Sequence, residues 1–373
     1  MKLANLKKIK LSQVKNLIIG SSDPVAVDIG TNSVKSIEIA RPKSSSEAID
    51  VRNFRIVSTP DNCLLSTYTE NPIINPTALQ DSIDSLVAST GLWNRNALVM
   101  LYDSAVVINW LSISGGEESE LVGLVEEKLS TFLPTPTNEW FIDFQVLEEK
   151  KDSKTIISEA IRRDNLLEFG RILQDSGLNI VTIDSSSFNL LNVFHRYLSD
   201  KENSKKNIAV VNMGHNNTSV MIMKEGTLKS QRNLGVGGKD FTQNIMDAKG
   251  IRYEEAEKYK QDEIFFLEDP TEEQNRNENY NIIKPSFGKL IKGLYDSFDH
   301  YLAKFREFKI HEILISGGGA NFRNINVLIH RHLNIPVKQG ADVIHIKYQG
   351  QEMMPVDKNT YAPAIGALLR ELQ

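Results

Sequence analysis

Cysteine is almost absent from this sequence, since Cys63 is the only one among 373 residues. An intramolecular disulfide and a thiolate metal cage are therefore excluded, and a reducing compartment is expected. Long apolar runs are absent too: residues 97–102 form one of the longest, far short of the ~20 residues that a membrane-spanning helix needs. A strong excess of one charge is also missing, with 43 Lys and Arg against 48 Asp and Glu.

The weak net charge of −5 hides an uneven distribution. Residues 1–22 carry five lysines and no acidic residue, which leaves −10 for the remainder. A basic nucleic-acid-binding surface is not expected on such an acidic body. The lysines interrupt every apolar stretch of residues 1–22, so this segment does not look like a signal peptide. We expect a cytoplasmic protein whose basic tail either contacts an acidic membrane leaflet or a partner, or stays solvated.

The length suggests two or three domains, and 40% hydrophobic residues suffice for a substantial core. Apolar periodicity in the first half predicts an antiparallel meander followed by alternating strands and helices. The expected strands are residues 25–28, 34–39, 51–57, 97–101, 106–113, 141–147, 155–161 and 180–184. The expected helices are residues 76–90, 117–133, 166–176 and 187–198.

The second half repeats the beginning of the first. Asp28-Ile29-Gly30 aligns with Asn212-Met213-Gly214, 184 residues later, and a similar three-strand pattern surrounds both copies. Such a repeat predicts duplicated α/β lobes, with residues 201–207 as a hinge. The expected strands are residues 208–212, 219–223, 226–234, 313–315 and 336–338. The expected helices are residues 239–248, 253–260, 287–308, 324–333 and 364–372, with an exposed loop at residues 261–281.

The two repeated turns carry residues suited to phosphate binding. Gly30 permits close approach of a ligand, and Thr31, Asn32 and Ser33 offer N–H and side-chain donors. Asp28 could hold a magnesium ion, directly or through water. An ordinary hairpin turn is the alternative for this segment, because the same residue types favour turns.

The second copy offers donors at Gly214, Asn216, Asn217 and Thr218, but begins with Asn212 instead of an aspartate. Asparagine keeps an oxygen acceptor and loses the negative charge, so it cannot act as a base.

Two glycine-rich segments follow, Gly237-Gly238 before a helix and Gly317-Gly318-Gly319 after a buried strand. Consecutive glycines indicate close approach either of a ligand or of another backbone. Neither segment matches the P-loop or the dinucleotide-binding fingerprint.

In their order and spacing, these motifs resemble the actin-like ATPase superfamily and, more narrowly, the PilM family of type IV pilus assembly proteins. The resemblance runs from about residue 24 to the C-terminus. Besides the hairpins and glycine turns, it rests on the break at residues 132–134, Asp143-Phe144-Gln145, Ser176-Gly177-Leu178 and Ala256-Glu257-Lys258-Tyr259.

The resemblance implies ribonuclease-H-like, actin-like lobes around a nucleotide cleft, each lobe with a smaller inserted subdomain. The first lobe would comprise residues 23–59 and 151–204, with residues 60–150 inserted. The second would comprise residues 205–245 and 309–373, with residues 246–308 as a helical insertion. Residues 1–22 lie outside the resemblance.

The implied ligand is ATP with Mg²⁺, and Asp28 would be the metal ligand. The implied nucleotide-binding residues are Asp28, Gly30, Thr31, Asn32, Ser33, Lys35, Asn212, Gly214, Asn216, Asn217, Thr218, Gly237, Gly238, Glu257, Lys260, Gly317, Gly318, Gly319 and Asn321. The family's second hairpin usually starts with Asp, so Asn212 predicts weak or absent ATP hydrolysis, and no catalytic residue is assigned.

The implied role is a cytoplasmic scaffold at the inner face of the inner membrane. Its main partner would be the cytoplasmic N-terminus of a PilN-like protein, in a groove formed with residues 60–150. Other components of the pilus platform and motor would be further partners, the chain could associate with itself, and no binding to nucleic acid is expected. One alternative is a small-molecule kinase of the same fold, with Asp184 as its base or simply as a helix N-cap. The other is an FtsA-like filament-forming tether, which the ending at Gln373 without an amphipathic tail disfavours.

Overall fold

The computed structural model describes residues 23–41, 48–115, 118–263, 278–350 and 357–372. The basic tail at residues 1–22 and most of the predicted loop at residues 261–281 lie outside them. The described residues within Met1–Val193, Ile346–Glu352 and Pro363–Gln373 form unit 1. Those within Phe194–His345 and Met353–Ala362 form unit 2. The chain passes from unit 1 to unit 2 within helix α4 (Ser186–Leu198) and re-enters unit 1 for a short stretch from Ile346. It returns to unit 1 finally within helix α10 (Lys358–Leu372).

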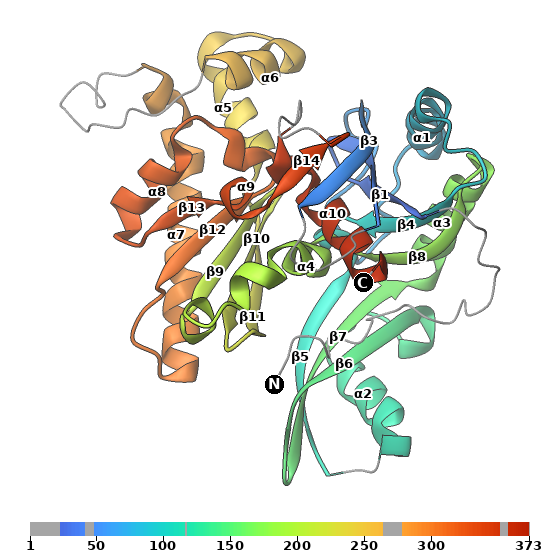
Figure 1. Cartoon of the computed structure of the whole chain (residues 1–373), viewed down its shortest axis with the longest axis vertical. Helices are drawn as coiled ribbons and strands as arrows, with labels where there is room; N and C mark the ends of the chain where they lie inside the picture. Colours follow the sequence, from blue (N-terminus) through green and yellow to red (C-terminus); the bar gives the residue numbers. More distant parts are fainter. Residues whose placement is uncertain (1–22, 42–47, 116–117, 264–277, 351–356, 373) are drawn as a thin grey trace. The chain divides into compact units, whose positions relative to one another are not determined.

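Unit 1 is built on a six-stranded sheet in the order β14-β3-β2-β1-β4-β8 (Figure 1). Its strands are β1 (Val25–Ile29), β2 (Ser33–Ile39), β3 (Ile49–Ser58), β4 (Asn96–Leu101), β8 (Asn179–Ser185) and β14 (Ile346–Tyr348). The first three form the antiparallel meander, and β4 and β8 continue the sheet in parallel to β1. Helices α1 (Pro76–Thr90) and α3 (Arg163–Asp175) contribute apolar side chains to the same core as these strands.

Unit 2 repeats this topology with a five-stranded sheet in the order β11-β10-β9-β12-β13. Its strands are β9 (Ile208–Met213), β10 (Thr218–Lys224), β11 (Thr227–Leu234), β12 (Glu312–Ser316) and β13 (Val337–Gln339). Again an antiparallel meander comes first and two parallel strands extend the sheet. The predicted duplication is therefore confirmed, and it covers five strands of each sheet rather than three.

Helices complete unit 2: α5 (Gly238–Lys249), α6 (Tyr253–Asp262), α7 (Glu278–Phe305), α8 (Ile325–Leu333) and the short α9 (Gly340–Val343). Fully buried Tyr301 and nearly buried Phe298 of α7 belong to the same core as the buried faces of β9, β10 and β12. The sheet strands and these helices thus share one continuous core.

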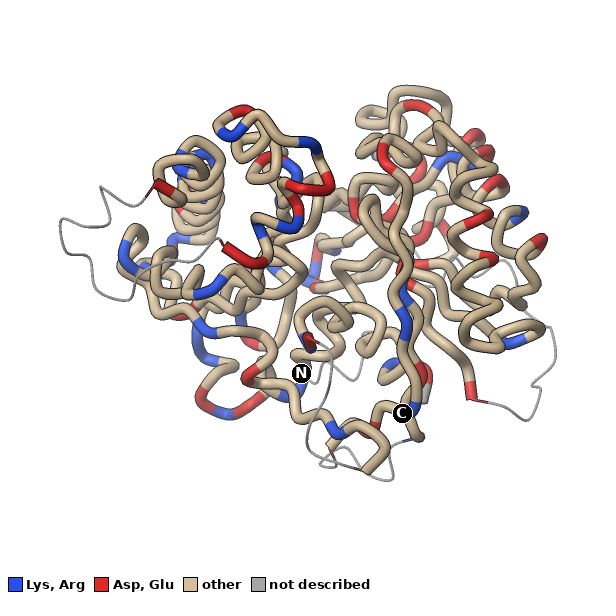
Figure 2. Tube along the Cα trace, turned by 90° about the horizontal axis from the view of Figure 1, so that it is seen from above, with Lys and Arg blue, Asp and Glu red and all other residues tan. Residues whose placement is uncertain are grey.

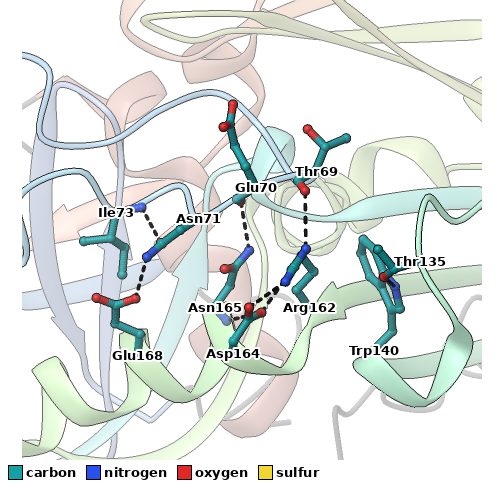
Figure 3. A network of polar contacts seen from close by, with 10 residues as sticks. All are labelled: Thr69, Glu70, Asn71, Ile73, Thr135, Trp140, Arg162, Asp164, Asn165 and Glu168. Atoms are coloured by element: carbon teal, nitrogen blue, oxygen red, sulfur yellow. Dashed lines mark hydrogen bonds and ion pairs between the residues drawn. The ribbon is translucent and has the colours of Figure 1, made fainter.

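A separate three-stranded sheet, in the order β5-β7-β6, belongs to unit 1. Its strands are β5 (Val107–Ser114), β6 (Trp140–Lys150) and β7 (Ser153–Arg162). Helix α2 (Leu121–Leu129) packs against it and closes a second core around Trp140, which is 1% exposed. The indole nitrogen of Trp140 donates to the Thr135 hydroxyl at 3.0 Å (Figure 3), as a buried indole requires.

The largely irregular segment at residues 60–75 is held to β7 and α3 by polar contacts (Figure 3). The Asn165 side chain donates to the Glu70 carbonyl at 3.3 Å. The Asn71 side chain donates to Glu168 at 2.8 Å and accepts from the Ile73 amide at 2.9 Å. These contacts replace the ladder hydrogen bonds that the segment lacks.

Helix α2 is shorter than predicted: it ends at Leu129, not at residue 133, and the short 3₁₀ turn Glu118–Glu120 precedes it. Two hydroxyl residues explain the early end. Ser130 donates to the Glu127 carbonyl at 2.7 Å, and Thr131 donates to the Lys128 carbonyl at 2.8 Å, so side chains satisfy the last carbonyls. Phe132, which lies within the predicted helix 117–133, is 58% exposed.

Helix α7 starts at Glu278, nine residues before its predicted start, so residues 278–281 are helical rather than part of an exposed loop. Pro285 lies inside it, and buried Ile283 anchors the additional turns in the core of unit 2. Helix α10 likewise begins at Lys358 and runs through Pro363. In both cases tertiary packing outweighs the tendency of proline to end a helix.

Acidic and basic residues are interspersed along the described chain (Figure 2). No helix among the described residues is long and apolar enough to cross a membrane.

Candidate functional site

The first predicted hairpin joins β1 to β2 in unit 1. The Gly30 amide donates to the Ser33 carbonyl at 3.0 Å and closes the turn. The register places Asp28 directly opposite Lys35, and the two side chains form an ion pair at 2.9 Å between Nζ and Oδ2. Both are largely buried, with side-chain exposures of 12% for Lys35 and 8% for Asp28. Removing either partner would leave an unpaired buried charge, which costs about 3–5 kcal/mol.

Two residues that sequence reasoning missed support this hairpin. Thr59, after β3, donates its amide to the Asn32 carbonyl and its hydroxyl to the Gly30 carbonyl, both at 2.9 Å. Ser186, at the start of α4, donates its hydroxyl to Asp28 Oδ1 at 3.1 Å. Both oxygens of Asp28 therefore have a donor already, although each keeps a second lone pair. No sequence signal marked either partner, because they come from separate strands and helices.

The second hairpin joins β9 to β10 in unit 2 and has the same geometry. The Gly214 amide donates to the Asn217 carbonyl at 2.9 Å. The register pairs Asn212 with Ser219, the positions 184 residues after Asp28 and Lys35. The ion pair of the first hairpin is thus replaced by two neutral side chains.

The start of helix α5 is built onto this second hairpin. The Gly238 amide donates to the Gly214 carbonyl at 2.9 Å, and the Lys239 amide donates to the His215 carbonyl at 2.8 Å. A Cβ on Gly237 would lie 2.4 Å from the His215 carbonyl oxygen, so only glycine fits there. This glycine serves close approach of another backbone, one of the two alternatives that the sequence left open.

Two polar side-chain atoms of the second hairpin have no hydrogen-bond partner although they are buried: Asn216 Oδ1 and Asn217 Nδ2. Buried polar atoms are normally paired, and an unpaired one calls for an explanation such as an absent ligand. The amide of Asn217 offers a donor, which is what a phosphate oxygen requires.

Glu257 and Lys260 of helix α6 meet the first turn of α5. Lys260 Nζ donates to the Thr242 hydroxyl at 2.6 Å and to the Gly238 carbonyl at 3.2 Å, and it forms an ion pair with Glu257. Burial lowers the pKa of Lys260, and the charge of Glu257 partly offsets this. Thr242, which the sequence did not place among the nucleotide-binding residues, connects the pair by donating to Glu257.

The triple-glycine turn packs against the end of β9. Gly317 has φ +82°, and a Cβ there would lie 2.5 Å from Asn212 Oδ1; a Cβ on Gly319 would lie 2.7 Å from Met213 Cβ. Gly318, by contrast, faces open space, with nothing within 4 Å of such a Cβ. Asn321, at the end of the turn, donates to the Asp357 carboxylate. Within unit 2 the structure therefore brings together the second hairpin, the α5 start and this turn.

His215 is a further residue of this cluster that the sequence did not single out. Its Nε2 lies 3.2 Å from the hydroxyl of Tyr253, the first residue of α6. Burial is the main cause that lowers the pKa of His215 to about 4, and the charge of Lys260 adds to it. The imidazole is therefore neutral at physiological pH.

Asp184, the candidate base of the kinase alternative, is 4% exposed and forms an ion pair with Arg370 of α10. It is not the cap of α4 either, because the Ser187 amide donates to Asp103 at 2.9 Å. Both oxygens of the Asp184 carboxylate are engaged, one by Arg370 and the other by the Ser185 amide, so the structure does not favour the kinase alternative.

Comparison with known proteins identifies the family. Among solved structures, a PilM-PilN type IV pilus biogenesis complex matches with a TM-score of 0.78 and 19% identity, covering 95% of this chain and 100% of that one. The ethanolamine utilization protein EutJ from Carboxydothermus hydrogenoformans matches with a TM-score of 0.50 and 14% identity, covering 99% and 96%. These likenesses confirm the duplicated actin-like α/β fold. The model of the family "Type IV pilus assembly protein PilM" matches residues 26–372, so this chain belongs to the PilM family of type IV pilus assembly proteins.

Proposed function

We propose that this chain is an ATP-binding scaffold of the inner-membrane platform of type IV pili, placed at the cytoplasmic face of the membrane. The observation that carries the nucleotide part is the second hairpin. It repeats the closed-turn geometry of the first hairpin, and it holds the unpaired buried donor Asn217 Nδ2 beside the start of α5. Backbone amides and amide side chains in such a turn suit a phosphate.

In this proposal the hairpin of unit 1 contributes Gly30, Thr31, Asn32, Ser33 and Lys35 to phosphate binding. The hairpin of unit 2 contributes Asn212, Gly214, Asn216, Asn217 and Thr218. Gly237, Gly238, Glu257 and Lys260 contact ribose and base, and Gly317, Gly318, Gly319 and Asn321 contact the adenosine.

The proposed magnesium ion is held by Asp28, through water or directly. The lone pairs that Asp28 retains fit such a contact, although Lys35 and Ser186 already engage both oxygens. The described residues contain no group of three or more His, Cys, Asp or Glu able to hold a metal. Mg²⁺ can bind with a single protein carboxylate, because it commonly keeps several water ligands and takes its other ligands from nucleotide phosphates.

Bound ATP is turned over very slowly or not at all in this proposal. Asn212 supplies no charge and no base at the second hairpin. The Asp28 carboxylate is engaged by the neighbouring lysine. The nucleotide then acts by ordering the protein.

Calorimetric titration of the full chain with ATP and Mg²⁺ tests the nucleotide part. Replacing Asn217 with aspartate keeps the shape and puts a negative charge where the phosphate would lie, so Asn217→Asp should weaken ATP binding about tenfold or more, or about 1.4 kcal/mol. Asn233→Asp, on β11 of the same unit, makes the same charge change on an exposed residue and should bind ATP normally. Asp28→Ala is less suitable as a test variant, because it leaves the buried Lys35 without its ion-pair partner. Absence of binding by the folded wild type, or equal binding by the hairpin variant, would refute this part.

The partner in this proposal is the cytoplasmic N-terminus of a PilN-like inner-membrane protein, with other platform components and self-association beyond it. The fold match to a PilM-PilN complex supports it, and residues 60–150 are the proposed contact region. A labelled synthetic peptide of that N-terminus should bind the full chain in fluorescence anisotropy, and a scrambled peptide of equal composition should not. Equal binding of both peptides would reject the partner while leaving the nucleotide result untouched.

A further inference from the structure

Four acidic side chains of unit 1 gather in one place: Asp103 in the turn after β4, Asp143 on β6, Glu159 on β7 and Asp184 on β8. Three of them are almost fully buried, with exposures of 4% for Asp103, 1% for Glu159 and 4% for Asp184. Carboxylates that are buried next to one another cannot all be ionised without compensating charges or donors.

Two of the four have strong partners. Asp103 accepts hydrogen bonds from the amide and the hydroxyl of Ser187 at the start of α4, where the helix dipole favours an anion. Asp184 forms an ion pair with Arg370 and accepts from the Ser185 amide at 2.8 Å. These partners account for two negative charges.

Glu159 has no such partner: both of its carboxylate oxygens are buried, and neither forms a hydrogen bond of ordinary geometry, although the Ser185 hydroxyl lies nearby. Asp143 accepts from the Phe144 amide at 2.8 Å through Oδ1, but its Oδ2 is also buried and unpaired. The register of β6 and β7 sets Asp143 directly opposite Glu159. Side chains at directly opposed positions share one face of the sheet at contact distance, and like charges there repel.

The surroundings of Glu159 favour its uncharged form. Burial raises the pKa of Glu159 well above its ordinary value, and the charges of Asp184, Asp103 and Asp143 raise it further, while the Ser185 hydroxyl lowers it. Burial also raises the pKa of Asp143 to about 7. Arg370 is the cation that faces this group, and it is engaged by Asp184. A proton held between Asp143 and Glu159 removes the repulsion between these opposed carboxylates.

We propose that Glu159 is a carboxylic acid in the folded protein, sharing its proton with Asp143, and that loss of this proton loosens the attachment of the three-stranded sheet to the lobe. The position of Glu159 in the chain supports the second half. Ala160 belongs to the core of the three-stranded sheet, and Ile161 belongs to the core of the six-stranded sheet. The cluster therefore joins strands β6 and β7 of the three-stranded sheet to Asp103, which follows strand β4 of the six-stranded sheet, and to Asp184, which belongs to its strand β8.

The pH dependence follows from the raised pKa values. A carboxyl group that keeps its proton when folded stabilises the fold fully below its unfolded pKa, and this stability is lost as pH rises through the folded pKa. For Asp143 the window runs from 3.8 to about 7. For Glu159 it begins at 4.5 and extends well above it. Alkaline pH is thus the condition that loosens the three-stranded sheet.

Infrared difference spectroscopy of the full chain tests the proton directly. At pH 7 the wild type should show the carbonyl band of a protonated, buried carboxyl group. Glu159→Gln should weaken this band, and Glu159→Gln combined with Asp143→Asn should remove it, because Asp143 itself has a pKa of about 7. Glu148→Gln removes an exposed carboxylate on β6 of the same sheet and should retain the band. A wild-type spectrum with no such band at pH 7 would overturn the proposal.

Stability against pH tests the consequence. We expect the unfolding constant of the wild type, divided by that of Glu159→Gln, to rise between pH 5 and pH 8 by up to about tenfold per pH unit. The wild type releases the Glu159 proton when it unfolds, and the variant has no such proton to release. As pH rises, backbone amides of β6 and β7 should exchange with deuterium faster in the wild type than in Glu159→Gln. Amides of β9 and β10 should exchange equally in both proteins. Asp143→Asn is a second variant for the case that Glu159→Gln folds poorly. Its stability should likewise depend less on pH than that of the wild type. Equal pH profiles for wild type and both variants would contradict the proposal.

Discussion

Replacement of Gly366 by alanine should destabilise this protein, although Gly→Ala inside a helix ordinarily helps. Gly366 lies in α10, where that helix crosses α4. A Cβ added at Gly366 would lie 1.8 Å from the Asn189 carbonyl oxygen and 3.2 Å from the Val193 nitrogen. Both obstacles are backbone atoms of a packed helix, so no side-chain rotation can relieve the clash.

The magnitude follows from that geometry. Ordinary contact begins near 3.4 Å, so the two helices would have to separate by about 1.6 Å at the crossing. Overpacking of this kind costs about 1–3 kcal/mol or more, and a clash with backbone belongs at the upper end. The helix-propensity gain of alanine returns only about 0.5–1 kcal/mol. A net loss of about 2–3 kcal/mol remains, a large share of the ~5–15 kcal/mol that stabilises a typical domain.

Thermal unfolding by calorimetry is the assay. A unit of about 200 residues shifts by about 2–4 °C per kcal/mol, so Gly366→Ala should lower the midpoint of unit 1 by roughly 4–12 °C. Gly170→Ala in α3 is the matched control, because nothing lies within 4 Å of its added Cβ, and it should raise the midpoint slightly. A Gly366→Ala protein as stable as wild type would show that the close helix crossing does not exist.

Two further predictions concern the cluster in unit 2. Gly237→Ala should weaken ATP binding roughly tenfold, because its Cβ would displace the second hairpin by an overpacking clash; Gly235→Ala, which meets nothing within 4 Å, should bind ATP as wild type does in the same titration. His215→Gln should make the protein less sensitive to acid. The pKa of His215 is lowered to about 4 in the folded chain. Between pH 6.5 and pH 4 this histidine is therefore protonated in the unfolded chain but not in the folded one, and wild-type stability falls as pH drops through this range. Urea midpoints at pH 7 and pH 5 measure this, and the exposed His300→Gln should leave the wild-type difference unchanged; an unaltered difference in His215→Gln would contradict the assignment.

Most helices and strands followed from local patterns. Helix α1 has the predicted ends because Asn75 caps it, with its side chain accepting from the Ala78 amide at 3.0 Å, and Gly91 closes it at φ +67°. Helix α2 ended early because Ser130 and Thr131 bind the carbonyls behind them. Strand β14 was missed entirely, since its three residues pair with β3 from almost the other end of the chain.

The sequence predicted the turns of the candidate site, but not the residues from other elements that hydrogen-bond to these turns. Both hairpins adopt the closed turns that their glycines suggested, and Gly30 and Gly214 make equivalent hydrogen bonds. Their supports could not be found from local sequence. Thr59 and Ser186 each reach the first hairpin from another element, and a lone Thr or Ser carries no periodicity or motif.

Local chemistry in the sequence therefore decided the two-lobed duplication, the hairpin turns and the type of most elements, because hydrogen bonding over a few residues and apolar spacing govern these. Tertiary structure alone decided which glycines meet backbone and which face open space, as Gly317 and Gly318 show. It alone also buried Glu159 opposite Asp143 without a hydrogen bond of ordinary geometry. Burial and the partners of a charge depend on chain segments far apart in sequence, and these set whether a carboxyl group keeps its proton.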